Sequence, residues 1–316
     1  MDTDLAFAAE SPYGLGDEPN FLGALSFLRR PYTKSVAGCD VVVSGVPFDC
    51  AVTNRPGTRF GPRAIRAAST VLAWSGGAWP YPGDPFEVLK VADYGDCYLD
   101  VGSPSSIAET IEAHARRLIE AGPSLLTLGG DHFITYPLLA AHAGKYGPLA
   151  LVQFDAHSDT WREDEKRIDH GTMFFHAARE GLIDPARSVQ VGIRSGNPET
   201  HGFTIIDANW VHANGPEATI ARIAETVGDA RAYLTFDIDC LDPAFAPGTG
   251  TPVCGGLSTW QARAILQGLG AIDFVAMDLV EVAPAYDHAE ITALAAATVA
   301  MDYLALRAGR KCAADG

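Results

Sequence analysis

The chain has 316 residues, and 47% of them are hydrophobic. A chain of this length and composition can bury a sizeable core, so we predict a folded α/β domain and little disorder. The formal net charge is −16, from 39 acidic and 23 basic residues. Because phosphate binding needs clustered Lys and Arg, this balance argues against nucleic acid and anionic membranes as partners.

The six cysteines are scattered and form no CxxC pair. Neither a zinc ribbon nor a disulfide framework is therefore expected. The N-terminus lacks the basic and apolar segments of a secretory signal. No apolar run approaches the roughly 20 residues that span a bilayer. We predict a cytoplasmic protein with reduced thiols.

The first 38 residues are rich in Pro, Gly and aromatic side chains and show no clear period. We predict an irregular N-terminal arm over residues 1–38 and a single catalytic domain over residues 39–316. From residue 40 onward, strand-like runs lie at 40–46, 87–92, 124–128, 149–154, 188–193, 232–236 and 274–279. Helical patterns lie at 61–69, 106–121, 135–145 and 289–307, and a further helix follows residue 170.

Strands that alternate with helices predict a mostly parallel sheet. The strands read as continuous apolar runs, which indicates that both faces of the sheet are buried. We therefore predict a three-layer α/β fold in which helices cover both faces of a sheet of about eight strands. In such sheets, ligands bind beyond the carboxyl ends of the strands.

Three short clusters of acidic residues and histidines follow such apolar runs directly. They are Gly-Gly-Asp-His at 129–132, Asp-Ala-His-Ser-Asp at 155–159 and Asp-Ile-Asp at 237–239. Side chains alternate in an extended chain, so the carboxylates of each cluster point the same way. Grouping so many carboxylates is unfavourable unless a cation lies among them. The clusters therefore predict a metal site.

For any single Asp or His a helix cap or a turn residue is the better explanation, but it does not account for three clusters at equivalent strand ends. Two metal ions would use all of the candidate histidines and carboxylates at these strand ends, whereas one ion would leave the charge of several carboxylates uncompensated. Carboxylate-rich sites without thiolates favour harder ions such as Mn²⁺, although affinity order alone leaves Co²⁺, Ni²⁺ and Zn²⁺ open. The predicted ligands are His132, Asp155, His157, Asp159, Asp237 and Asp239.

Further residues invite a functional and a structural interpretation. A helix cap from Asp169 or Thr172 explains part of the segment around His170, and spacing alone does not decide whether His170 transfers protons. Asp278 and Glu281 lie at the end of another predicted strand, which favours a role in the site. Thr249 lies in a tight loop, and the sequence leaves open whether its hydroxyl contacts a ligand. His114 and His142 lie in helical patterns, where we predict surface or boundary positions.

The three clusters resemble the signature motifs of the ureohydrolases, which include arginase, agmatinase and guanidino-acid hydrolases. Four more segments are similar to bacterial agmatinases: Gly-Val-Pro-Phe-Asp at 45–49, Asp-His-Gly-Thr-Met-Phe at 169–174, Ala-Pro-Gly-Thr-Gly-Thr-Pro at 246–252 and Glu-Val-Ala-Pro-Ala-Tyr-Asp at 281–287. The resemblance implies an arginase/deacetylase-like fold, a homotrimer or homohexamer, and hydrolysis of a guanidino group to urea and an amine.

The resemblance also implies a role for each site residue. One Mn²⁺ would take His132, Asp155, Asp159 and Asp237, and the other Asp155, His157, Asp237 and Asp239, so that Asp155 and Asp237 bridge. His170 would shuttle protons and Glu281 would bind the guanidinium. Asp159 would help to relay a proton to the departing amine.

The loop between Asp159 and His170 is longer and more charged than is typical of bacterial agmatinases. We expect Trp161 and Arg162, at its start, to contact the far end of the substrate. Basic residues in this loop (Arg162, Lys166, Arg167) would suit a carboxylate, whereas acidic ones (Glu163, Asp164, Glu165) would suit the distal ammonium of agmatine. Agmatine is the leading prediction and a guanidino acid such as 4-guanidinobutanoate the second. A metal-dependent deacetylase and a silent subunit of a hetero-oligomer are weaker alternatives.

Overall fold

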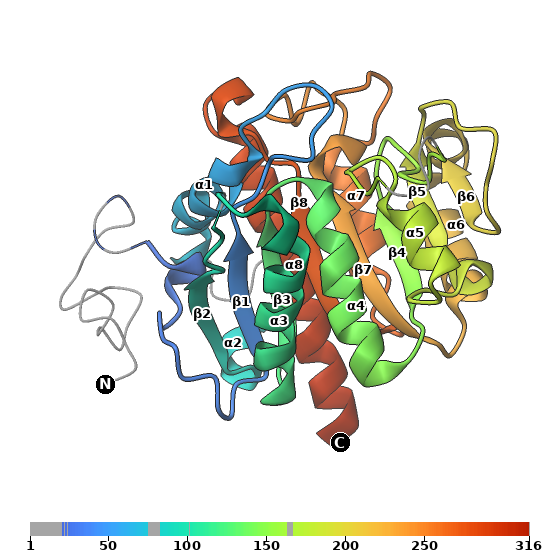
Figure 1. Ribbon diagram of the computed structural model, residues 1–316. Coiled ribbons are helices and arrows are strands. Elements are labelled where there is room, and N and C mark those ends of the chain that lie inside the picture. The colour runs from blue at the N-terminus through green and yellow to red at the C-terminus, as the bar shows by residue number, and fades with distance from the viewer. Residues whose placement is uncertain are drawn as a thin grey trace.

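The structure is a computed structural model that describes residues 21, 23, 25–74, 83–100, 102–162 and 167–315. Eight strands form one sheet in which every pair is parallel, in the order β2-β1-β3-β8-β7-β4-β5-β6 (Figure 1). The strands are β1 (Val41–Val46), β2 (Val91–Asp96), β3 (Ser124–Gly129), β4 (Ala150–Phe154), β5 (Val189–Ile193), β6 (Thr204–Asp207), β7 (Arg231–Asp237) and β8 (Asp273–Val280).

Helices cover both faces of the sheet, which confirms the predicted three-layer α/β architecture. They are α1 (Gly61–Ser69), α2 (Pro85–Val88), α3 (Ile107–Glu120), α4 (Thr135–Tyr146), α5 (Met173–Arg179), α6 (Ala208–Val227), α7 (Thr259–Gln267) and α8 (Ile291–Asp315). Alternate residues of β1 enter different cores: Val41 and Val43 pack with α1 and α8, whereas Val42 packs with α3 and α4. This two-sided burial explains why the strands read as continuous apolar runs.

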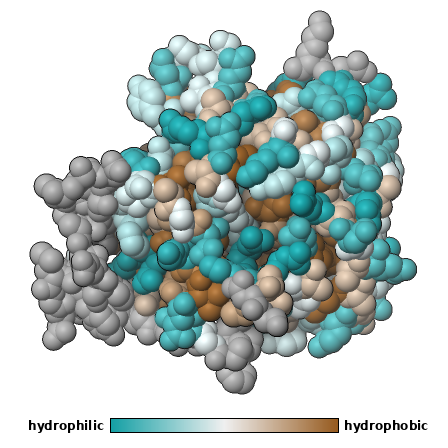
Figure 2. Space-filling model, turned by 90° about the horizontal axis from the view of Figure 1, so that it is seen from below, coloured by the Kyte–Doolittle hydropathy of each residue, from teal (hydrophilic) through white to brown (hydrophobic). Residues whose placement is uncertain are grey.

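The carboxyl ends of the strands lie at the top of the molecule in Figure 1, together with the loops that follow β1, β7 and β8. Figure 2 shows the opposite side, from below, where hydrophobic residues lie interspersed with hydrophilic ones. The predicted ligand clusters all belong to the top edge.

Two parts of the element prediction were wrong or incomplete. Residues 87–92 were expected to form one strand, but Asp84 accepts a hydrogen bond from the N–H of Phe86, and Pro85 starts the short helix α2. The strand begins only at Val91. Strand β6 and helices α6 and α7 were not predicted.

Part of the predicted N-terminal arm packs closely against the domain. Phe27 and Leu28 are fully buried. The N–H of Phe27 donates to Asp93 at 2.8 Å, and the same carboxylate pairs with Arg66 of α1 at 2.8 Å. Residues 1–20 of the predicted arm lie outside the described residues, as do residues 163–166 of the charged loop.

Helix α8 corrects the expectation that no segment has the length and apolarity of a membrane span. Residues Ile291–Ala314 pass that test, with a mean hydropathy of 1.3. However, 78% of the most apolar window is buried inside the protein, where α8 packs against α1 and α7. A helix that is mostly buried needs the same apolar composition, so this helix belongs to the core.

His114 and His142 are buried, contrary to the surface or boundary positions predicted for them. His142 is fully buried, and its Nδ1 lies 2.7 Å from the carbonyl oxygen of Leu138. Burial lowers the pKa of His142 to about 4. In the unfolded chain the same ring takes up a proton near pH 6.5. Stability contributed by His142 is therefore present above pH 6.5 and is lost as the pH falls towards 4.

We expect this loss to be measurable by urea denaturation at pH 7.5 and 4.5. Between pH 7.5 and pH 4.5 the free energy of unfolding of the unmodified protein should fall. The fall should be about 2–3 kcal/mol larger than in His142→Leu, because leucine has no proton to gain at this position. The exposed His288 provides the control, since His288→Leu should follow the unmodified protein. Equal acid sensitivity of His142→Leu and the unmodified protein would contradict the assignment.

Candidate metal centre

The structure brings the three sequence clusters and Glu281 together at the carboxyl ends of four neighbouring central strands. His132 starts the 3₁₀ turn His132–Ile134 after β3, and Asp155 directly follows β4. Asp237 is the last residue of β7, and Glu281 directly follows β8. These strands are adjacent in the order β3-β8-β7-β4, so residues far apart in sequence meet at one place.

The first group of ligands surrounds Nδ1 of His132. Three carboxylate oxygens lie close to this atom, at 2.9 Å (Asp159), 3.1 Å (Asp155) and 3.3 Å (Asp237). All four side chains are buried. Donor atoms of His132, Asp155 and Asp237 all lie within 4.8 Å of one another, which is close enough to hold one cation.

The second group adjoins the first and shares Asp155 with it. Nδ1 of His157 lies 3.1 Å from Asp239 Oδ2 and 3.5 Å from Asp155 Oδ1. The donor atoms of these three residues again lie within 4.8 Å of one another. Asp155 therefore presents one oxygen to each group. By the same separation of donor atoms, Asp237 belongs to the first group, so its bridging role stays a prediction.

The electrostatics of the site fit a cation. Burial and the charge of Asp155 raise the pKa of Asp159 to about 7. Burial and the charges of Asp239 and Asp155 raise the pKa of Asp237 well above its usual range. Nδ1 of His132 is buried and makes no hydrogen bond with any described residue, despite the three nearby carboxylates. Carboxylates that resist ionisation beside an unpaired imidazole nitrogen form a set that a metal ion would satisfy.

A hydrogen-bond relay behind His132 fixes which nitrogen carries the proton. The hydroxyl of Thr235 donates to Asp278, so it can only accept from Nε2 of His132, which lies 2.8 Å away. Nε2 therefore bears a hydrogen, which leaves Nδ1 as the nitrogen that can present a lone pair to a metal ion. Relays of this kind orient the histidine ligands of metal sites.

Asp278 thus occupies a different place from the one expected for a substrate-binding residue. It is fully buried, and besides Thr235 its carboxylate accepts hydrogen bonds from Thr135 and Tyr233, each at 2.8 Å. It is not among the described residues that line the cavity above the site. Its position behind His132 makes it a support of a predicted ligand.

Removing the hydroxyl of Thr235 should weaken metal binding. We expect Thr235→Val to lower the affinity for Mn²⁺ by about 10–100-fold, because the tautomer and orientation of His132 are no longer held. Thr235→Ser keeps the hydroxyl and should bind metal like the unmodified protein. Equilibrium dialysis with metal analysis measures both variants, and an unchanged affinity in Thr235→Val would show that the relay is unimportant.

A second support, which sequence reasoning missed, holds Asp155. Nε2 of Gln153 donates to Asp155 Oδ2 at 2.7 Å, and the carbonyl of the Gln153 side chain accepts from Gln190. Both glutamines are fully buried in strands β4 and β5. The sequence did contain a signal for this support, because Gln153 is a polar residue inside an otherwise apolar run. A buried glutamine needs polar partners.

Glu281 and His170 form a pair beside the two groups. Nδ1 of His170 lies 3.0 Å from Oε1 of Glu281, and the same oxygen accepts the backbone N–H of His132 at 2.9 Å. Burial opposes a charged ring, but the bond with Glu281 and its charge raise the pKa of His170 to about 9. Oε2 of Glu281 is buried and has no hydrogen-bond partner among the described residues. That oxygen is free to accept from a bound cation.

Two of these side chains depend on unusual backbone geometry. Asp159 has φ of 52° and Glu281 has φ of 64°. Residues other than Gly rarely adopt this left-handed conformation, and such strain gathers at functional sites. Asp159 therefore departs from the simple strand alternation used to predict it, yet it still reaches His132.

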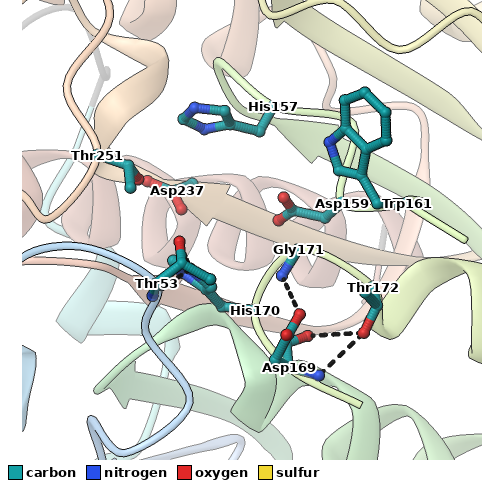
Figure 3. Close-up of a pocket in the computed structure, with 10 residues that line it drawn as sticks. All are labelled: Thr53, His157, Asp159, Trp161, Asp169, His170, Gly171, Thr172, Asp237 and Thr251. Atoms are coloured by element: carbon teal, nitrogen blue, oxygen red, sulfur yellow. Dashed lines mark hydrogen bonds between the residues drawn. The ribbon is translucent and has the colours of Figure 1, made fainter. Parts of the chain in front are cut away.

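A cavity of about 290 Å³ opens above the two groups (Figure 3). Trp161 lines it and is 38% exposed. Figure 3 shows the carboxylate of Asp159 below the ring of His157, with Thr53 and His170 side by side across the cavity. The lining consists of Thr53, His157, Asp159, Trp161, Asp169, His170, Gly171, Thr172, Asp237 and Thr251.

Two residues expected to bind substrate lie elsewhere. The guanidinium of Arg162 lies 5.8 Å from the centre of the Phe175 ring on α5. Thr249 is fully buried, and its hydroxyl has no hydrogen-bond partner among the described residues. Neither belongs to the described lining of the cavity. From the loop that contains Thr249, the residue in the lining is Thr251, whose hydroxyl lies 3.2 Å from Asp239.

Known proteins resemble this chain over most of its length. The model of the arginase family matches residues 39–305. The agmatinase of Chromobacterium violaceum is 55% identical over 314 residues, which is 98% of this chain and 97% of that protein. The agmatinase of Proteus mirabilis is 53% identical over 290 residues, which is 91% of this chain and 94% of that protein.

Solved structures give the same result. The crystal structure of a hypothetical agmatinase from Burkholderia thailandensis is 56% identical, with a TM-score of 0.94, and 99% of each chain is covered. Proclavaminate amidino hydrolase from Streptomyces clavuligerus is 38% identical, with a TM-score of 0.88, over 92% of this chain and 99% of that chain. The chain belongs to the arginase family and is a ureohydrolase.

Proposed function

We propose that the protein hydrolyses agmatine to putrescine and urea with the help of two Mn²⁺ ions. The observation that carries this proposal is the pair of His and Asp groups that share Asp155, next to a buried carboxylate oxygen of Glu281 that has no partner among the described residues. The names of the relatives support the same substrate.

One ion would be held by His132, Asp155, Asp159 and Asp237, and the other by Asp155, His157, Asp237 and Asp239. A ligand set of carboxylates and imidazoles without thiolates suits Mn²⁺, whereas Co²⁺, Ni²⁺ and Zn²⁺ remain open from affinity order alone. When bound, the ions would supply an activated water near neutral pH, since a bound metal lowers the pKa of water from about 15.7 to near 7.

The side chains around the ions orient the substrate and move protons. A guanidinium is a planar cation whose N–H groups match a carboxylate, so Oε2 of Glu281 would accept from it. Hydrolysis forms a C–O bond and breaks a C–N bond at the guanidinium carbon, so the departing amine must take up a proton. Asp159 and His170 both line the cavity and can supply that proton.

The charge of the cavity supports agmatine over a guanidino acid. Among its described lining residues there are three carboxylates, from Asp159, Asp169 and Asp237, and no Lys or Arg. Trp161 adds an aromatic face that can attract a distal ammonium. For the carboxylate of 4-guanidinobutanoate the described lining offers no unpaired positive side chain, since His170 is paired with Glu281, and Arg167, beside the lining, is paired with Asp169. Residues 163–166 of the charged loop lie outside the described residues, so their charges do not enter this comparison.

The proposal is tested by urea release from a panel of guanidines with the purified chain loaded with Mn²⁺. We expect kcat/KM for agmatine to exceed that for 4-guanidinobutanoate by at least about tenfold. A preference for the guanidino acid would replace the proposed substrate. Absence of urea from every guanidine would overturn the function and favour the silent-subunit alternative.

We also propose that residues 39–316 form the catalytic domain, which the family match over residues 39–305 supports. All six cysteines are free thiols, in keeping with a cytoplasmic setting. A homotrimer or homohexamer remains our expectation, and light scattering of the purified protein measures it.

A further inference from the structure

The ring of His170 is held by a loop that the sequence did not connect with it. Nε2 of His170 lies 2.9 Å from the backbone N–H of Thr53 and 2.7 Å from its hydroxyl oxygen. The backbone N–H of His170 also points to the carbonyl of Ala51, at 3.4 Å. Thr53 therefore contacts His170 twice, and both residues line the cavity (Figure 3).

The two contacts suit the two protonation states of the ring. A backbone N–H can only donate, so it pairs with Nε2 when that nitrogen carries no hydrogen. A hydroxyl both donates and accepts, so Thr53 Oγ1 can accept from Nε2 when the nitrogen is protonated. In either state Nδ1–H faces Oε1 of Glu281, 3.0 Å away. The ring can therefore keep a partner at Nε2 in both states, with a small shift from the backbone N–H towards the hydroxyl when Nε2 gains its hydrogen.

The loop that carries Thr53 is itself anchored at both ends. The N–H of Ala51 donates to the buried carboxylate of Asp131 at 2.9 Å. The side-chain amide of Asn54 donates to the carbonyl of Gly250 at 2.9 Å. The backbone of residues 51–54 is thus fixed without the help of the Thr53 hydroxyl, and a change in that side chain alone should leave the loop in place.

We propose that Thr53 is the positioning residue of His170: its hydroxyl accepts the Nε2 proton of the charged ring and holds the imidazole between Glu281 and the cavity. This inference rests on the proposed function, in which His170 exchanges protons. Other charged groups that act on the ring are Glu281, Asp159 and Asp131, all of which favour the charged form. Among the contacts of Nε2 with described residues, Thr53 supplies both the donor and the acceptor.

The test compares Thr53→Val, which removes the hydroxyl and keeps the size and the backbone N–H, with Thr53→Ser, which restores the hydroxyl. Thr298→Val is the matched control, because its hydroxyl bonds to a helix carbonyl on an exposed part of α8. All proteins are loaded with Mn²⁺, their metal content and thermal unfolding are recorded, and urea release from agmatine is measured across pH.

In Thr53→Val we expect kcat to fall about tenfold while KM changes by less than about twofold, because the substrate is still bound but the proton carrier is poorly held. His170→Asn identifies the limb of the kcat–pH profile that depends on His170, because that limb disappears in this variant. In Thr53→Val the same limb should move to lower pH, because the charged ring has lost its hydrogen-bond acceptor. Thr53→Ser should regain both properties, and Thr298→Val should resemble the unmodified enzyme.

Three results would overturn the inference. Unchanged kcat in Thr53→Val would show that the hydroxyl is dispensable. A raised KM with unchanged kcat would make Thr53 a substrate-binding residue. Loss of metal or of folding in Thr53→Val, with Thr53→Ser equally inactive, would make its role structural. An unmodified enzyme that releases no urea would instead refute the proposed function, and this outcome is recognised before any variant is compared.

Discussion

Replacing His170 by Asn is expected to lower kcat for urea release by about 10²–10⁴-fold, the usual contribution of a positioned proton-transfer group. Asn can still donate to Glu281 from near the position of Nδ1, but it has no atom at the position of Nε2 and does not titrate. His170 is not among the predicted metal ligands, and therefore the variant should bind the same number of ions as the unmodified protein.

Small bases give this prediction its control. If His170 carries protons between the cavity and solvent, imidazole added to His170→Asn should restore part of the turnover, and it should have little effect on the unmodified enzyme. Metal analysis and urea assays of the same samples separate a proton-transfer defect from metal loss. Full activity in His170→Asn would remove this residue from the reaction.

Asp155→Ala is expected to abolish tight binding of both ions. Asp155 belongs to both groups of ligands, with one oxygen facing His132 and the other facing His157. Metal content should fall from two ions per chain to less than one, and urea release should fall by at least about a thousandfold, because no activated water is available. Metal analysis after dialysis and a urea assay measure these effects.

Thermal unfolding provides an independent readout of the same variant. Excess Mn²⁺ at about a thousand times Kd should stabilise the unmodified protein by about 4 kcal/mol for each bound ion, and it should scarcely stabilise Asp155→Ala. The exposed carboxylate of Asp229 serves as the control, since Asp229→Ala removes an equal charge far from the site. Two tightly held ions in Asp155→Ala would refute the shared-ligand assignment.

The central strands and the convergence of the predicted metal ligands were predictable because both follow from local patterns. β3, β4 and β7 end within one residue of the predicted positions, since each is an apolar run followed at once by polar residues. Parallel strands bring such residues to the same edge, which is why His132, Asp155 and Asp237 meet. Those assignments needed no knowledge of contacts distant in sequence.

The supporting residues were not predictable in this way. Thr53 and His170 are 117 positions apart, and Thr235 and His132 are 103 apart. A threonine in a loop or strand has many ordinary explanations, and nothing nearby in the sequence identifies its distant partner. Asp278 illustrates the same difficulty, because its position near a strand end resembles that of a substrate-binding acid, whereas its contacts with Thr135, Tyr233 and Thr235 appear only in the structure.

Element errors also have local causes. Asp84 and Pro85 form a helix start that overrides the β propensity of the residues after them. Helix α6 contains Gly215 with φ of 79° followed by Pro216, and this break hides its helical period. The burial of His142 depends on how α4 lies against β7, which a helical pattern alone does not specify.

The place of β8 in the sheet has a consequence for how the protein is made. β8 is the last strand of the described chain, yet it lies between β3 and β7 (Figure 1). While the ribosome is still translating the chain before Asp273, the three strands on one side and the four on the other have no shared neighbour, and both expose an unpaired edge. A nascent chain stalled at that stage would be prone to aggregate. Because Glu281 follows β8 directly, joining the two half-sheets and completing the guanidinium site would be a single late event.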